Sequence, residues 1–245
     1  MTQKQPRWPW FGLGLITGLA GGWWLSGRRS ATPRMLFLNI WQRELAKTRG
    51  ATDAALLAGR IQAHYNDLWA RRPHFRHPVL NLHVRASILP GLALYQVLRE
   101  EHETQAAALA EAEKLIAVIL TKQALPFPLL KRLPDPFAVF RFAGRWVLRL
   151  AFPAPGWNTT FVEDTADCLA FEVHDQCIYQ KILTDFGAPE LTAVFCQMDD
   201  LVYSQLAPEI SFTHDKTLGR GDDYCSFRFC RNDVASAEDT AKTIV

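Results

Sequence analysis

The longest run of apolar residues lies near the amino terminus and predicts a membrane span. Residues 8–25 contain no charged side chain, and tryptophans stand at both ends of the run. These eighteen residues, at about 1.5 Å rise each, cover roughly 27 Å, close to the thickness of a bilayer's hydrocarbon core. Arg28 and Arg29 follow, where a cleaved signal peptide would carry small residues. We therefore expect residues 8–27 to form an uncleaved single-pass transmembrane helix in contact with membrane lipid, and a buried core helix is the rival interpretation.

Two further features of this segment bear on its partners. Gly14, Gly18 and Gly22 recur every four residues, a spacing that permits close helix packing and predicts a homodimer formed through the anchor. The basic residues that flank the span slightly favour a cytoplasmic body.

Helical spacing of apolar positions continues from residue 35 to residue 155. Pro90 and Gly91 interrupt a long apolar run and should kink or split its helix. Asp53 is placed to cap one helix. The predicted helices span residues 35–47, 53–71, 102–123 and 137–152.

The last of these helices is amphipathic and basic. Arg141, Arg145 and Arg149 recur every fourth residue and fall on one stripe of a helix. This stripe is typical of a helix that lies on anionic lipid. The alternative is that the arginines are solvated or pair with the acidic half of the chain.

From residue 156 the pattern changes to short alternating segments. Their order predicts a ββααββ unit with an antiparallel sheet, so the fold class is α+β with an N-terminal transmembrane helix and a helical middle region. The strands are expected at 157–164, 168–175, 210–215 and 224–231, with helices at 176–187 and 188–208. The corresponding domains are a membrane anchor and linker (1–34), a helical region (35–155), an α+β domain (156–231) and a flexible polar tail (232–245).

Charge divides the chain in the same way. Residues 161–245 hold six Lys and Arg against sixteen Asp and Glu, whereas the first 160 hold 21 against nine. The two parts therefore face different surroundings or each other. The basic residues form no recognised nucleic-acid module, so no nucleic-acid partner is expected. Five cysteines are too few for a disulfide-stapled scaffold, although a Cys168–Cys230 disulfide stays open.

The last third of the chain carries a set of short motifs. They are GAPEL at 187–191, FCQMDD at 195–200 and TLGRGDDYCSFRF at 217–229. Together with Cys177 they resemble the L-2-amino-thiazoline-4-carboxylic acid hydrolase family. The resemblance extends over residues 75–231 and is specific after about residue 170. The matching positions are Cys177, Glu190, Leu191, Cys196, Asp199, Thr217, Leu218, Gly221, Cys225, Phe227, Arg228 and Phe229.

The resemblance implies that the protein hydrolyses a C–N bond in a cyclic amidine or a similar small molecule, with Glu190, Thr217 and Arg228 binding the substrate. Ser226 and His214 depart from the family's pattern, which has Asp and Arg near these positions. The last strand also resembles small-molecule-sensing 4-vinyl-reductase-type domains. A non-catalytic binding or sensor domain tethered to the membrane is therefore the alternative function.

Hydrolysis of an amidine needs a group that moves protons. Asp199 and Asp200 follow Cys196 by three and four residues, so all three lie near one face of a helix, and the two acids are the best general acid/base candidates. His214 is a further candidate base. Gly219 and Gly221 are expected to supply a tight turn with positive φ.

The three remaining cysteines come from three separate elements. Cys177, Cys196 and Cys225 could hold zinc as thiolates, could supply a nucleophile with a histidine or aspartate as its base, or could be buried packing residues. The residues alone leave these three interpretations open.

Overall fold

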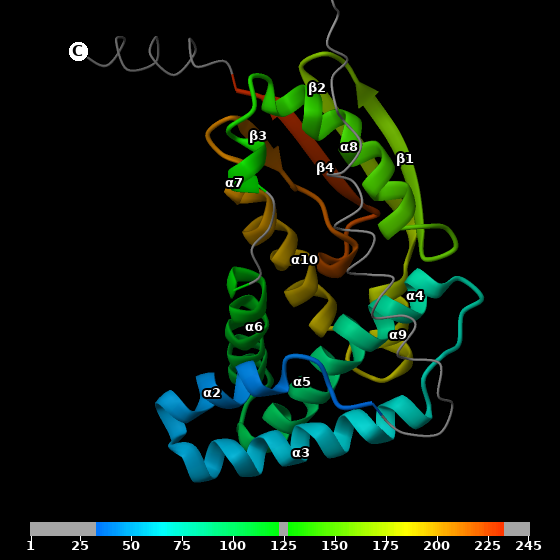
Figure 1. Ribbon diagram of the computed structural model, residues 1–245. Helices are drawn as coiled ribbons and strands as arrows, with labels where there is room; N and C mark the ends of the chain where they lie inside the picture. Colours follow the sequence, from blue (N-terminus) through cyan, green and yellow to red (C-terminus); the bar gives the residue numbers. More distant parts are fainter. Residues whose placement is uncertain (1–32, 123–126, 233–245) are drawn as a thin grey trace, which may run out of the picture. The chain divides into compact units, whose positions relative to one another are not determined.

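The computed structural model describes residues 33–122 and 127–232 (Figure 1). The predicted span at 8–27 lies outside the described residues, as does nearly all of the predicted tail. Among the helices of the described part, none is both long and apolar enough to cross a membrane.

The first half of the described chain is helical, as predicted. One predicted detail is wrong: Asp53 does not cap its helix, because the helix begins two residues earlier, after Gly50. Asp53 lies in the first turn, where its carboxylate complements the positive end of the helix dipole. The helices are α2 (Leu38–Arg49), α3 (Ala51–Ala70), α4 (Pro78–His83), α5 (Leu89–Glu101), α6 (Gln105–Lys122), α7 (Phe127–Leu130) and α8 (Pro136–Ala151).

The predicted interruption at Pro90 takes the form of a π-helical segment. This segment, η1 (Val84–Ile88), joins α4 to α5 without leaving the helix. Proline has no N–H to donate to the carbonyl of Ala86, four residues earlier, so a wider turn just before Pro90 accommodates the missing bond.

The second half contains a four-stranded antiparallel sheet in the order β1-β2-β4-β3. The elements follow the predicted ββααββ order. They are β1 (Trp157–Asp164), β2 (Cys168–Cys177), α9 (Ile178–Asp185), α10 (Leu191–Tyr203), β3 (Ile210–Thr213) and β4 (Tyr224–Arg231), with short 3-10 turns η2 (Ser204–Leu206) and η3 (Leu218–Arg220).

One face of the sheet is aromatic and is covered by helices. Phe171 and Phe227 lie opposite each other on β2 and β4, and their rings stack with centroids 4.8 Å apart. Phe229 on the same face contacts Phe140 of α8 and Tyr203 of α10. Both helices therefore pack on this inner face, as Figure 1 shows for α8. The hydrophobic core continues from the sheet into the helices before residue 155.

Two arginines of α8 form ion pairs with the acidic half of the chain. Arg141 and Arg145 both pair with Asp164 at the end of β1, at 2.5 and 2.9 Å. Pairing with the acidic half, one of the two predicted alternatives, is therefore observed for these two residues. The side chain of Asp135 caps the start of α8 by accepting the N–H of Ala138.

The disulfide left open by the sequence is present. Cys168 and Cys230 lie directly opposite each other on β2 and β4 and are bonded. It ties the two central strands of the sheet to each other. The other three cysteines are free.

Candidate active site

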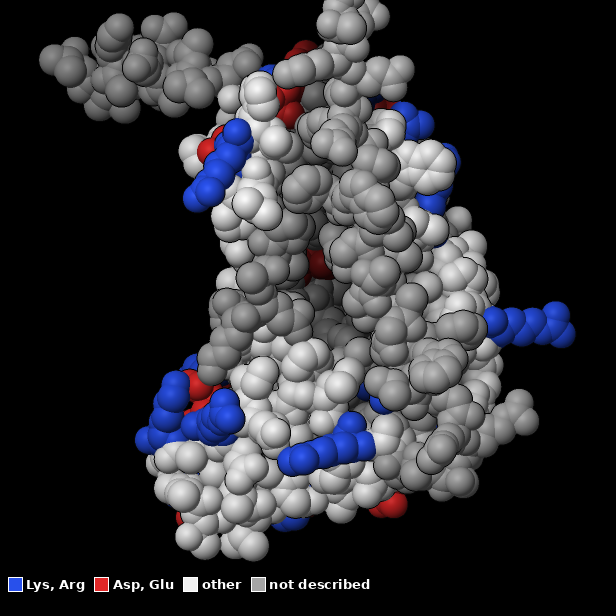
Figure 2. Space-filling view, in the orientation of Figure 1, with Lys and Arg blue, Asp and Glu red and all other residues white. Residues whose placement is uncertain are grey.

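Helix α10 carries three of the predicted site residues on one face. Asp199 and Asp200 lie about one helical turn after Cys196. In Figure 2 acidic atoms are visible deep in the centre of the view, in the region where Figure 1 places α10.

The three free cysteines gather around Asp199. Cys177 ends β2, Cys196 lies in the middle of α10, and Cys225 stands on the inner face of β4. The thiols of Cys196 and Cys225 are hydrogen-bonded to each other, and the negative charge of Asp199 opposes ionisation of all three cysteines. Elements far apart in the chain thus bring these four residues to one place.

The three thiols differ in how readily they ionise. Burial raises the pKa of Cys177 to about 11. The hydrogen bond with Cys225 and burial raise the pKa of Cys196. The same hydrogen bond lowers the pKa of Cys225, helped by the Leu218 N–H, 3.2 Å from its Sγ. Cys225 is therefore the thiol that ionises most easily, and the other two stay protonated at neutral pH.

Asp199 is an acid whose ionisation the fold opposes. Its exposed area is intermediate, but the protein packed around it makes the charged carboxylate unfavourable. Burial raises its pKa from 3.8 to about 7, and the charge of Asp200 also raises it, while His214 opposes both effects. A carboxyl group with a pKa near 7 can both accept and donate a proton at neutral pH, as a general acid/base must.

His214 lies beside the two acids. Its side chain is 1% exposed, its ring stacks on Phe227 at 4.4 Å between centroids, and its Nδ1 lies 3.5 Å from Oδ1 of Asp200. Neither ring nitrogen is hydrogen-bonded to another described residue. Arg220 pairs with the other oxygen of Asp200 at 3.8 Å. The imidazole is thus fixed in place by packing and keeps its hydrogen-bonding capacity for another group.

The η3 turn packs against α10 beside the site. Thr217 is buried, and its Oγ1 accepts the N–H of Arg220 at 3.2 Å. Gly221 has the predicted positive φ, at 92°, but the prediction is wrong for Gly219. Gly219 is needed for close approach, because a Cβ there would lie 2.8 Å from Sγ of Cys196 and 3.1 Å from the α10 backbone.

Two predicted substrate-binding residues lie away from this cluster. Arg228 alternates with Cys225 along β4, so it lies on the opposite face of the sheet, where it pairs with Glu163. Glu190 precedes α10, nine residues before Asp199, which is about 13 Å along the helix axis.

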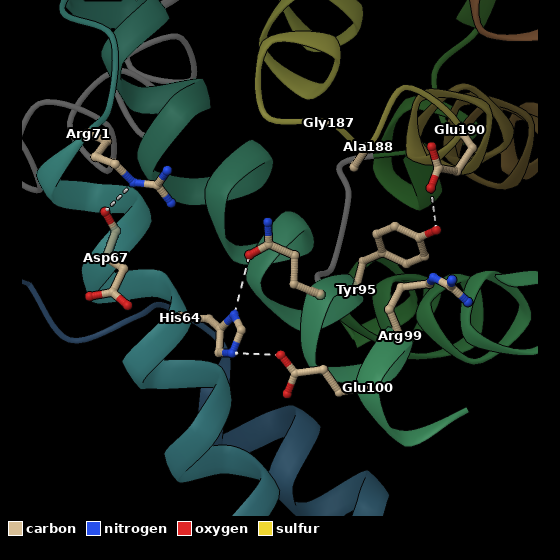
Figure 3. A pocket seen from close by; sticks show the side chains of 10 residues that line it. His64, Asp67, Arg71, Tyr95, Arg99, Glu100, Gly187, Ala188 and Glu190 are labelled. Carbon is tan, nitrogen blue, oxygen red and sulfur yellow. Dashed lines mark hydrogen bonds and ion pairs between the residues drawn. The ribbon is translucent and has the colours of Figure 1, made fainter. Parts of the chain in front are cut away.

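Glu190 instead belongs to a separate polar pocket of about 420 Å³. Figure 3 shows the Tyr95 hydroxyl from α5 pointing at Glu190; it donates a 2.5 Å hydrogen bond to Oε1. Burial raises the pKa of Glu190, but hydrogen bonds from Tyr95, its own backbone and Gln105 outweigh burial and lower the pKa overall. The lining residues are His64, Asp67, Arg71, Tyr95, Gln96, Arg99, Glu100, Gly187, Ala188 and Glu190.

Sequence analysis missed this pocket. The signal that could have indicated it is the pair of polar positions Gln96 and Arg99, which share one side of helix α5 and follow its apolar first turns. Within residues 33–122 and 127–232, no group of three or more His, Cys, Asp or Glu side chains is arranged to hold a metal ion. The zinc alternative therefore has no ligand set there.

Comparison with known proteins gives a family match and remote structural matches. Residues 82–229 match the model of the family described as L-2-amino-thiazoline-4-carboxylic acid hydrolase. No curated protein matches the chain. The crystal structure of the Fe(II) unliganded H-NOX protein from K. algicida is 13% identical, with a TM-score of 0.32, and the match covers 81% of this chain and 96% of that one. A mutant of that protein matches with 10% identity, a TM-score of 0.34 and the same coverage. These TM-scores are too low to bear on the chemistry.

Proposed function

The chain belongs to the L-2-amino-thiazoline-4-carboxylic acid hydrolase family, and we propose on this premise that it hydrolyses a C–N bond in a cyclic amidine while tethered to a membrane by residues 8–27. The observation that carries the proposal is Asp199, an acid that lies among three thiols and a histidine and whose pKa burial raises to about 7. The family match supports hydrolysis, and the amino-acid sequence alone supports the tether.

In the proposed reaction, Asp199 moves the protons. Its carboxylate takes a proton from water as the water oxygen bonds to the amidine carbon between sulfur and nitrogen. Because the amidine is protonated when water adds, the tetrahedral intermediate is neutral. The resulting carboxylic acid donates its proton to the ring nitrogen as the C–N bond breaks, and the Asp199 carboxylate takes the hydroxyl proton of the intermediate as the carbonyl forms. His214 lies close enough to the two acids to hydrogen-bond the substrate or the tetrahedral intermediate.

The test is turnover by the full chain in detergent micelles, with L-2-amino-thiazoline-4-carboxylate as substrate. Asp199→Asn keeps the shape of the side chain but cannot exchange the proton, so kcat should fall by about 10²–10⁴. Asp185→Asn is the matched control, since Asp185 lies on α9, is exposed and pairs with Lys181; its kcat should stay at the wild-type value. Full activity of Asp199→Asn would overturn the proposal.

A thiol route is the competing mechanism, and Cys225 is its best candidate because its pKa is lowered. Cys225→Ser separates the two: the Asp199 route expects a small effect, whereas a thiol nucleophile requires near-complete loss of kcat.

The alternative function is binding without turnover. It is favoured by the raised pKa values of Cys177 and Cys196, which leave these thiols unreactive at neutral pH. Saturable binding of the thiazoline carboxylate without product formation would support a sensor domain in place of an enzyme.

A further inference from the structure

Helix α8 is apolar on two opposite faces. Its inner face packs on the sheet through Phe140, whose ring lies 4.8 Å from that of Phe229. Its outer face carries large side chains exposed to solvent. These are Val139 (42% exposed), Phe142 (71%), Trp146 (57%), Val147 (51%) and Leu150 (60%).

The outer side chains form one stripe. At about 100° per residue, positions 139, 142, 146 and 150 fall within about 80° around the helix axis. The stripe runs along most of α8. Among the described residues, nine large hydrophobic side chains are exposed, and five of these are on this one helix. A helix that is apolar on both faces is normally covered on both by other apolar groups. We therefore expect another molecule or surface to cover the outer stripe.

We propose that the outer stripe of α8 lies against the lipid surface of the membrane that holds the chain. This inference rests on the tether in the proposed function and is independent of the hydrolysis. The aromatic rings of Phe142 and Trp146 would enter the boundary between headgroups and acyl chains. Trp, Phe and Leu on one side of a helix, with arginines beside them, are typical of helices that lie in this boundary.

The charges on α8 fit such an orientation. Arg145 and Arg149 are exposed and lie on one flank of the stripe. Arg145 is 46% exposed even though it pairs with Asp164, so its guanidinium still has donors free for a phosphate group. A helix seated in the interface would bring both arginines to headgroup level.

The chain outside the described residues argues for lipid over a second copy of the protein. The uncharged run ends at Leu25, and Met35, only ten residues later, is already buried in the core. Ten extended residues reach at most about 35 Å. The folded part of the chain, held this close to the bilayer, encounters lipid at a high effective concentration. A second copy of the protein could cover the stripe instead only if its own effective concentration were higher.

The experiment is lipid photolabelling of the full chain in vesicles of phosphatidylcholine and phosphatidylglycerol. The vesicles contain a phospholipid with a diazirine in its acyl chain, and labelled peptides are identified by mass spectrometry. We expect label in α8 as well as in residues 8–27. Leu56 on α3 and Val162 on β1 are also exposed, and peptides that contain them should carry only background label.

The double variant Phe142→Ser, Trp146→Ser tests the stripe itself. Because both side chains are exposed, the fold should be kept, which a thermal melt will check. Label in α8 should fall about tenfold, because the two most exposed rings of the stripe no longer enter the lipid. Label in residues 8–27 should not change. Leu56→Ser is the matched control and should leave the α8 label unchanged.

Each other outcome has a distinct meaning. Label in residues 8–27 with none in α8 would overturn the proposal and leave the tether intact. Label in neither would overturn both. Photocrosslinks from α8 to a second copy or to residues 8–27 would identify a protein partner for the stripe and would also overturn it. Label in α8 alone would support the surface contact and refute the tether.

Discussion

The raised pKa of Asp199 predicts an unusual dependence of stability on pH. An ordinary buried carboxylate in an ion pair has a lowered pKa and stabilises the fold as pH rises. Asp199 is the reverse, because its pKa is about 7 in the folded protein and about 3.8 when the chain is unfolded. Between these two values the folded state binds the proton more tightly than the unfolded state does. The free energy of unfolding therefore falls as pH rises from about 4 to about 7 and is level beyond that range.

The size of this effect follows from the two pKa values. At about 1.4 kcal/mol per pKa unit, Asp199 alone removes up to about 4 kcal/mol of stability between pH 4 and pH 8. Asparagine does not ionise, so Asp199→Asn should lack this part of the pH dependence and should be more stable than the wild type at pH 8.

The assay is urea unfolding of the full chain in mild detergent at pH 5, 6, 7 and 8, for the wild type and two variants. The quantity of interest is the difference in unfolding free energy between wild type and Asp199→Asn, since contributions from other groups cancel in it. Asp185→Asn, whose acid is exposed and paired with Lys181, should follow the wild type at every pH. Parallel curves for wild type and Asp199→Asn would refute the idea that the folded state holds this carboxyl protonated.

Three further predictions concern the fold around the site. Gly219→Ala should lower the unfolding free energy by about 1–3 kcal/mol, because its Cβ would lie 2.8 Å from Sγ of Cys196; no loss in urea unfolding would show that η3 can move off α10. Asp135→Ala removes the cap of α8 and the ion pair of Asp135 with Arg231 and should cost about 1 kcal/mol by the same measurement, whereas Asp135→Ser, which can keep only the cap, should restore part of it. Thiol trapping in whole cells should find Cys168 and Cys230 oxidised if the body lies in an oxidising compartment; free thiols there would instead favour the predicted cytoplasmic body.

Much of the sheet could be predicted because its strands show clear alternation. In residues 224–231, Cys225, Phe227 and Phe229 alternate with polar residues, and the structure places all three on the inner face. The positions that alternate with them, such as Arg228, face away from the helices. Because side chains along a strand alternate between its two faces, Arg228 and Cys225, three residues apart, face opposite ways. The sequence was therefore enough to indicate that these two residues do not share one site.

The environment of Asp199 could not be predicted in the same way. Helical spacing places Asp199 and Asp200 on neighbouring positions and cannot tell which one is enclosed. The distinction arises from tertiary packing: burial raises the pKa of Asp199, whereas the side chain of Asp200 is 43% exposed and reaches Arg220. Two adjacent acids therefore acquire different chemistry because of elements that lie elsewhere in the sequence.

Gly219 shows how this packing is achieved. Its motif predicts a turn, and a turn explains Gly221, but the absent Cβ of Gly219 serves the contact between η3 and α10. That contact holds Leu218 where its N–H reaches Sγ of Cys225. The same contact borders Sγ of Cys196, the thiol that is hydrogen-bonded to Cys225. A side chain at residue 219 would push η3 away from α10, so we expect Gly219→Ala to change the ionisation of Cys225 as well as the stability. The rate of Cys225 alkylation as a function of pH measures this effect, and an unchanged pH profile would mean that the Leu218 N–H does not depend on the close approach.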